Sequence, residues 1–109
     1  MDHIRKNWAA LRERIARAAA RAGRDPDAIE VVAVSKTRSA EEVAAAYECG
    51  LHIAGENRIQ EAATKRPLVA APVSWHLVGH LQTNKAARAV ELFDLVQSVD
   101  SERLARALD

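Results

Sequence analysis

The chain has 109 residues, a length that fits one compact domain and excludes a complete (β/α)8 barrel, which normally needs about 250 residues. Sixteen Lys and Arg against fifteen Asp and Glu leave a formal charge of +1, which gives no reason to expect binding to nucleic acid or to an anionic membrane. The single cysteine, Cys49, excludes an intramolecular disulfide. Because no apolar run approaches the ~20 residues of a membrane span, and the charged N-terminus lacks a secretory pattern, we expect a cytoplasmic protein.

The amino-terminal part of the chain predicts one amphipathic helix over residues 3–22. Apolar side chains recur there at helical spacing, at Ile4, Trp8, Leu11 and Ile15. The arginines on the other faces alternate with Glu13 and with alanines, which favours a solvated helix face over a nucleic-acid surface. Gly23 ends the helix.

The rest of the chain alternates predicted strands and helices. The four predicted strands cover residues 29–35, 51–55, 74–79 and 94–99. The predicted helices follow them, from Ser39 to residue 50, over 58–66, over about 84–92, and from Asp100 or Ser101 to Leu108.

Two helix starts carry capping residues. Ser39 and Glu42 form an S-x-x-E capping box, and Asn57 is a candidate cap for the helix over 58–66. Strands that alternate with helices are parallel, with right-handed crossovers. We therefore predict an α/β fold over residues 1–109, a single domain in which an N-terminal helix precedes four parallel βα units.

Lys36 is the first candidate functional residue, because it directly follows a buried apolar strand. Functional groups of parallel sheets and barrels collect at the carboxyl ends of the strands. Partial burial would favour the neutral amine, which a Schiff base with an aldehyde or ketone requires. The alternative is a lysine that only extends into solvent from the strand end.

Polar groups also end the next two strands. Gly55-Glu56-Asn57 places a carboxylate and an amide at the same edge of the sheet, although Asn57 as a plain helix cap is the alternative. His76 lies inside the third strand and His80 at its end, about 13 Å apart at about 3.3 Å per residue, so we expect no shared metal ion. His76 is then an interior polar group or a contact at the site.

Other classes of site are disfavoured. The glycines are dispersed and form neither a dinucleotide-binding loop nor a P-loop, and no G-x-S-x-G motif is present. A nucleotide enzyme and a hydrolase both become less favoured.

Three ordered motifs resemble those of the pyridoxal phosphate homeostasis proteins, a family of barrel proteins similar in fold to the N-terminal domain of alanine racemase. The motifs are AVSKT at 33–37, GENRIQE at 55–61 and WHLVGHLQTNK at 75–85, followed by SVD at 98–100. The resemblance implies that Lys36 forms the internal aldimine with pyridoxal 5′-phosphate and that Asn57, His76 and His80 lie on the cofactor's side of the sheet edge. It implies a protein that binds, buffers and delivers the cofactor without catalytic turnover.

The resemblance covers the N-terminal half of the family, equivalent to the first half of a TIM barrel. In the family four more βα units follow, and loops after the seventh and eighth strands hold the cofactor's phosphate. Four strands alone would leave barrel-interior side chains and two sheet edges uncovered. We therefore expect either a truncated form of a longer protein or a half-barrel that closes by self-association, and weaker cofactor binding than in a full-length relative.

Two other interpretations stay open. One is an amino-acid racemase or decarboxylase of the same fold type, and the other is a structural half-barrel that binds nothing. Racemisation in the related enzyme needs a second base from a separate domain, and the only tyrosine here, Tyr47, is expected in the middle of a helix, facing the packing side.

Overall fold

The computed structural model describes all 109 residues and contains one four-stranded sheet. The strands are β1 (Ala33–Val34), β2 (Ile53–Glu56), β3 (Ser74–Leu77) and β4 (Leu95–Val96). They are all parallel and lie side by side in the order of the sequence. One row of the register joins Val34, Gly55, His76 and Leu95. The predicted α/β class, with four parallel βα units after a leading helix, is confirmed.

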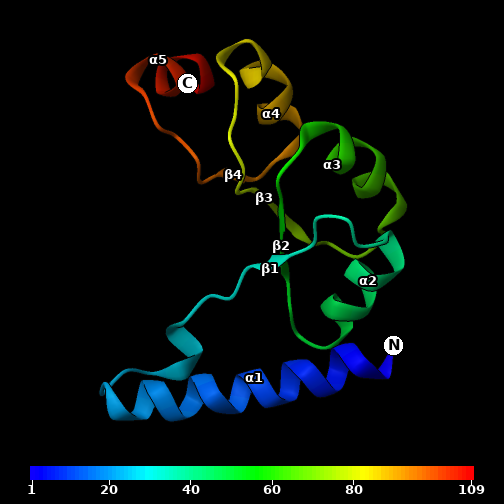
Figure 1. The fold of residues 1–109 in the computed structure, drawn as a ribbon, viewed down its shortest axis with the longest axis vertical. Helices are drawn as coiled ribbons and strands as arrows, with labels where there is room; N and C mark the ends of the chain where they lie inside the picture. Colours follow the sequence, from blue (N-terminus) through cyan, green and yellow to red (C-terminus); the bar gives the residue numbers. More distant parts are fainter.

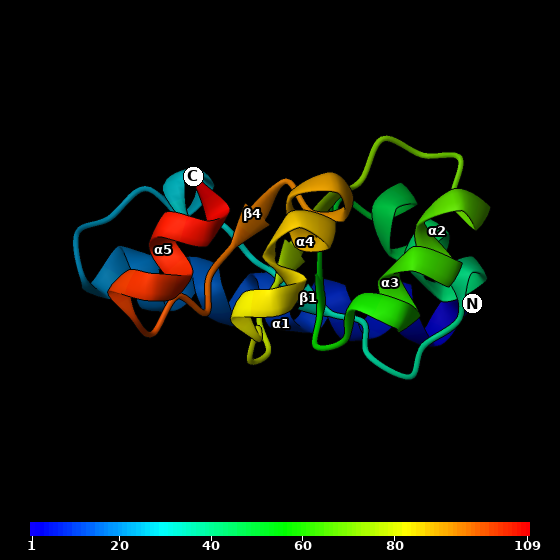
Figure 2. The same ribbon diagram turned by 90° about the horizontal axis from the view of Figure 1, so that it is seen from above.

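Five α-helices accompany this sheet. They are α1 (Asp2–Arg21), α2 (Ala40–Glu48), α3 (Ile59–Lys65), α4 (Ala86–Leu92) and α5 (Glu102–Leu108). Three short 3-10 helices lie in the connections: η1 (Pro26–Ala28), η2 (Arg66–Leu68) and η3 (Thr83–Lys85). The helices α2 to α5 form an arc along one side of the sheet (Figure 1), and a second view shows the same four in a row (Figure 2). None of the helices is long and apolar enough to span a membrane.

The strands are shorter than predicted, most of all at the two sheet edges. The strands expected over 29–35 and 94–99 keep only two ladder residues each, whereas β2 and β3 keep four. Each edge strand has one neighbour, so residues beyond the paired segment have no second ladder to hold them extended. The predicted strand at 51–55 begins two residues later, and the one at 74–79 ends two residues earlier.

The two capping predictions have different outcomes. Ser39 caps α2 as expected, since its hydroxyl accepts from Glu42 N at 3.1 Å and the Glu42 carboxylate accepts from Ser39 N at 3.2 Å. The prediction for α3 is wrong, because its N-cap is Arg58 and no side chain caps the helix. Asn57 is therefore free of that structural role.

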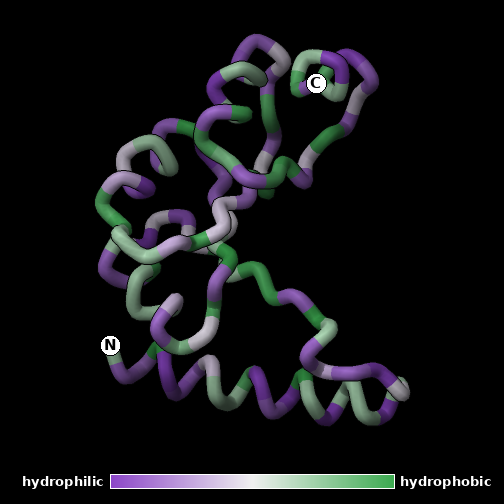
Figure 3. Tube along the Cα trace, turned by 180° about the vertical axis from the view of Figure 1, so that it is seen from behind, coloured by the Kyte–Doolittle hydropathy of each residue, from purple (hydrophilic) through white to green (hydrophobic).

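The core lies between the sheet and the arc of helices. Ala54, Trp75 and Leu77 face the helices and are at most 3% exposed. Successive side chains of a strand point to opposite faces, so Gly55 and His76 belong to the other face. Their register partners Val34 and Leu95 lie on that face too, where they are 56% and 49% exposed. Figure 3 shows this open side between α1 and the C-terminal helix, bordered by apolar segments. We call it the open face below.

Candidate functional site

Lys36 lies in a tight turn directly after β1. Arg38 N donates to Ser35 O at 3.0 Å, which closes a turn over residues 35–38. Thr37, the third residue of that turn, has a φ of 63°, a left-handed conformation that costs a β-branched residue about 1–3 kcal/mol. Lys36 itself is exposed, in contrast to the partial burial expected from the sequence, so solvent reaches its side chain.

The residues on both sides of Lys36 are held by other elements. The Ser35 hydroxyl donates to Glu56 Oε2, and Ser35 N donates to Gly55 O at 2.8 Å. Thr37 N donates to Glu61 Oε2 of α3 at 2.6 Å. The backbone that carries Lys36 is therefore fixed to β2 and to α3, whereas the Lys36 side chain is unpaired.

Lys65 of α3 joins these contacts into one network. Its Nζ donates to Ser35 O at 2.7 Å, to Glu61 Oε2 at 2.9 Å and to Glu56 Oε1 at 3.0 Å. Lys65 is 6% exposed and Glu56 is fully buried, so both charges are removed from water and are paired with each other. The hydrogen bond from Lys65 is the main cause that lowers the pKa of Glu61, and the bond from Thr37 N adds to it.

Sequence reasoning missed most of this network. Glu56 was expected at the functional edge of the sheet, but its side chain points toward α3 and is buried beneath the turn. The only local indication of Lys65 is its spacing from Glu61, because residues four apart are neighbours on a helix surface. The bond to Ser35, thirty residues away, depends on the tertiary fold.

The strand register brings Lys36 and Asn57 to matching positions. Val34 pairs with Gly55, and each candidate follows its paired residue by two positions, just beyond the carboxyl end of its strand. His76 lies beside Gly55 and is 6% exposed. Its Nδ1 accepts from Gln97 Nε2 at 2.9 Å, which leaves the proton on Nε2. Lys36 and Asn57 thus follow the carboxyl ends of adjacent strands, and His76 lies on the next strand, β3.

His80 is placed differently. It lies beyond the end of β3, is 70% exposed at its side chain, and its Nδ1 lies 3.4 Å from Asp100 Oδ2. The structure pairs it with the segment after β4. No group of three or more His, Cys, Asp or Glu residues is arranged to hold a metal ion.

Gly79 brings the loop after β3 onto Asn57. A Cβ at this position would lie 2.6 Å from Asn57 O and 2.8 Å from Asn57 Cα, closer than real side chains approach a backbone. Only glycine permits this contact. The close approach fixes the backbone of Asn57 between the ends of β2 and β3.

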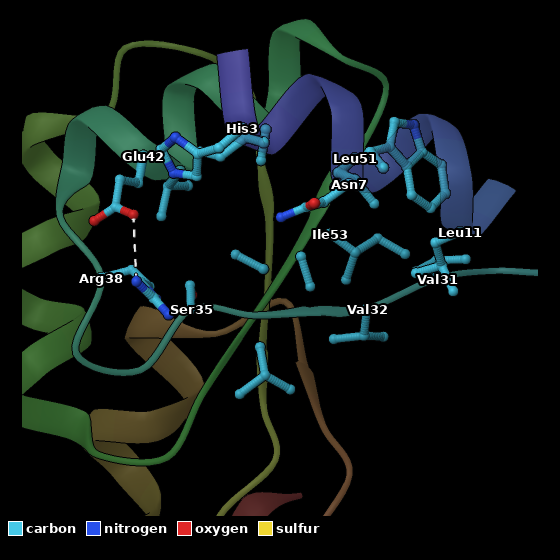
Figure 4. A pocket seen from close by; sticks show the side chains of 17 residues that line it. His3, Asn7, Leu11, Val31, Val32, Ser35, Arg38, Glu42, Leu51 and Ile53 are labelled. Atoms are coloured by element: carbon cyan, nitrogen blue, oxygen red, sulfur yellow. Dashed lines mark ion pairs between the residues drawn. The ribbon is translucent and has the colours of Figure 1, made fainter. Parts of the chain in front are cut away.

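A cavity of about 440 Å³ lies beside the free edge of β1, between α1 and α2. Figure 4 shows its polar end, where Arg38 Nη1 lies 3.7 Å from Glu42 Oε2 and His3 lies close by. Hydrogen bonding to the Ser39 backbone is the main cause that lowers the pKa of Glu42, and Arg38 and His3 add to it. The remaining lining is mostly apolar, and none of the four predicted site residues belongs to it.

Comparison with known proteins gives a consistent set of sequence relatives. The pyridoxal phosphate homeostasis protein of Pseudomonas aeruginosa is 42% identical over 109 residues, covering 99% of this chain and 47% of that protein. The protein of the same name from Escherichia coli K12 is 38% identical over 113 residues, covering 100% of this chain and 48% of that protein. The chain therefore spans about half the length of the curated relatives it matches. No protein-family model matches the chain.

Two solved structures resemble the fold. PipY of Synechococcus elongatus PCC7942, solved with PLP bound, has a TM-score of 0.72 and 42% identity, covering 86% of this chain and 45% of PipY. A protein of unknown function from Bifidobacterium adolescentis has a TM-score of 0.88 and 32% identity, covering 96% of this chain and 47% of that one. Both likenesses again extend over about half of the solved chain.

Proposed function

Since this chain is related over its whole length to one half of the pyridoxal phosphate homeostasis proteins, we propose that it binds pyridoxal 5′-phosphate through the amine of Lys36. The proposed role is cofactor binding and homeostasis in the cytoplasm, without catalytic turnover. The single observation that carries the proposal is the turn after β1, which holds the backbone on both sides of Lys36 and leaves its side chain exposed.

The residues present fit such a ligand. Pyridoxal 5′-phosphate supplies an aldehyde, which condenses with a primary amine and releases water. Lys36 offers that amine at the carboxyl end of a parallel strand, the edge at which such sheets bind ligands. Asn57, which follows β2, and the Nε2 hydrogen of His76 on β3 add polar groups on the two neighbouring strands. His80 is the outermost of the proposed contacts, because its observed partner is Asp100.

Borohydride reduction after incubation with pyridoxal 5′-phosphate tests the proposal. Peptide mapping should locate the added mass on Lys36, and Lys36→Ala should lose it. Lys85→Ala is the matched control, because Lys85 is also exposed but lies in η3, and this variant should retain the adduct on Lys36. Absence of an adduct on Lys36, or an equal adduct in Lys36→Ala, would overturn the proposal.

The phosphate of the cofactor gives a second test. In a (β/α)8 barrel the phosphate is commonly held after the seventh and eighth strands, which this four-stranded sheet does not contain. We propose that the chain binds the cofactor more weakly than the Pseudomonas aeruginosa relative does. Titration followed by absorbance should show this difference, and tight phosphate-dependent binding by a single chain would contradict it.

The enzyme alternative finds no support in the position of Tyr47. This side chain packs against the core, and its ring centroid lies 4.6 Å from that of His52. Tyr47 is therefore part of the packing of α2 and is not offered as a base beside Lys36. If the chain is a structural half-barrel that binds nothing, borohydride reduction will leave no adduct on Lys36.

We further propose that the open face is covered by a second copy of this chain. β1 and β4 each have one unpaired edge, and Val34, Leu95 and Val99 are between 45% and 56% exposed. Two four-stranded halves have the strand number of a closed barrel, in which such edges disappear. Sedimentation over a range of micromolar concentrations should show a dimer, and a well-folded monomer throughout would contradict this proposal.

A further inference from the structure

We infer that Glu56, Glu61 and Lys65 are positioning residues for Lys36, and that their network also prevents Lys65 from competing for the aldehyde. The inference deepens the proposed function and rests on it only in the role given to Lys36. The three residues lie on the helix-covered side of the sheet: Glu56 and Lys65 are buried between β2 and α3, and Glu61 is in the first turn of α3.

The hydrogen bonds of the network end on the residues that flank Lys36. The network reaches the turn at three points: Ser35 O, the Ser35 hydroxyl and Thr37 N. These groups immediately precede and follow Lys36. Ser35 O also accepts from Arg38 N, so the ammonium of Lys65 donates to the same carbonyl that closes the turn. A network that only stabilised α3 would have no need to meet both flanks of one exposed residue.

The backbone of Thr37 has an unusual conformation that the network holds in place. Its left-handed φ is the only positive φ of a residue other than glycine in this chain. Such a conformation persists where the surroundings hold it, and Glu61 supplies a charged acceptor to Thr37 N at 2.6 Å. Glu61 thus stabilises the turn shape that sets the direction in which Lys36 leaves the backbone.

The network also affects which lysine amine can react with the aldehyde. The chain has four lysines: Lys6, Lys36, Lys65 and Lys85. Lys65 has three N–H donors, and Ser35 O, Glu56 and Glu61 accept from them. Its side chain is only 6% exposed and all three donors are engaged, so the aldehyde of a ligand in solvent does not reach this amine. Lys36 is therefore the accessible amine at this edge of the sheet, and Lys65, although it contacts Ser35, does not compete with it for the aldehyde.

A pair of substitutions at Glu61 separates positioning from stability without any cofactor. Glu61→Ala removes the acceptor of Thr37 N, whereas Glu61→Gln keeps an acceptor oxygen at the same reach. Amide hydrogen exchange, followed by NMR, should be at least ten-fold faster at Thr37 in Glu61→Ala and should return to near the wild-type rate in Glu61→Gln. The amide of Ser74, which donates to His52 O at 2.9 Å on the central strand β3, is the reference for global unfolding.

The same variants are then reduced with borohydride after incubation with pyridoxal 5′-phosphate. We expect the share of adduct on Lys36, relative to the other lysines, to fall at least three-fold in Glu61→Ala and to recover in Glu61→Gln. Glu91→Ala, which removes an exposed carboxylate that pairs with Arg88 at 3.0 Å, should behave as the wild type. Lys65→Met should likewise disperse the adduct.

The outcomes separate the two proposals. If the wild-type chain carries no adduct on Lys36, the proposed function fails, while the exchange rates at Thr37 still test the positioning network. If the wild-type adduct is on Lys36 but Thr37 exchange and adduct distribution are unchanged in Glu61→Ala, the positioning role is wrong. Faster exchange at both Thr37 and Ser74 would also overturn it, because the network would then stabilise the whole chain and not the turn.

Discussion

The two faces of the sheet are built from neighbouring residues of the same strands, yet they differ in almost every physical property. On the helix-covered face, Trp75 and Leu77 are at most 2% exposed and pack within one apolar cluster. On the open face, Val34 and Leu95 remain about half exposed. The difference shows that the hydrophobic driving force of this half-barrel acts mainly on one side. The other side keeps its polar candidates and an apolar surface available for contacts.

The buried charges on the covered side provide the strongest test of this contrast. Lys65→Met leaves Glu56 buried without its cation, so we expect a loss of about 4 kcal/mol in the free energy of unfolding. Arg88→Met breaks an exposed ion pair with Glu91 and should cost about 0.5 kcal/mol or less. Urea unfolding of both variants measures the difference. Similar losses would show that Glu56 and Lys65 are hydrated in solution.

A pair of leucines compares the faces with one chemical change. Leu77→Ala removes a side chain that is 1% exposed and should cost about 3 kcal/mol. Leu95→Ala removes one that is 49% exposed and should cost about 1 kcal/mol or less at low protein concentration. Denaturant midpoints provide the measurement. An equal loss for both would mean that the open face is covered in solution.

Gly79 and Gly55 differ in what a methyl group at each position would contact. Gly79→Ala places a Cβ against the backbone of Asn57, which cannot yield, so we expect a loss of about 2 kcal/mol. Gly55→Ala places one 2.9 Å from Val32 Cγ1, the end of a side chain on the open face that can move, and should cost less. Thermal unfolding distinguishes the two. A larger loss for Gly55→Ala would show that the open face is tightly packed.

The smallest expected effect is a pH dependence at Glu61. Its pKa in the folded chain is lowered, chiefly by the hydrogen bond from Lys65, so its ionised form stabilises the folded state above the unfolded pKa of about 4.3. This contribution disappears as the pH falls through the lower folded pKa. The difference in unfolding free energy between wild type and Glu61→Gln should therefore be constant from about pH 7 to pH 5 and narrow below about pH 4. A gap that widens in acid would contradict the lowered pKa.

The parallel order of the strands and the capping box at Ser39 could be predicted because both depend on local patterns. Alternating apolar runs and helical segments define βα units, and the S-x-x-E spacing defines one helix start. Strand lengths could not be predicted in the same way. Ile29 and Val99 lie in apolar stretches that suit a strand, but their pairing depends on whether a neighbouring strand is present.

In the candidate site, too, some residues could be predicted from local sequence and others depend on tertiary contacts. Lys36 was recognisable from its place after an apolar strand, and Asn57 directly follows the last residue of β2, the neighbouring strand. The expected cap role of Asn57 failed because the close approach of Gly79, a contact between two loops, fixes that residue instead. The role of Lys65 could not be predicted from the sequence, because its partner Ser35 lies thirty residues away.

The order of the strands has a further consequence for how the chain folds. Because β1 to β4 follow the sequence, each βα unit contacts mainly the units before and after it, as in a repeat protein. Stability in such an arrangement is approximately a sum of unit and neighbour terms, and folding can start in the middle and spread outward. The unit built on β2 and β3 has neighbours on both sides and should form the nucleus. The terminal units, including the one that carries Lys36, should then be the last to form and the first to open.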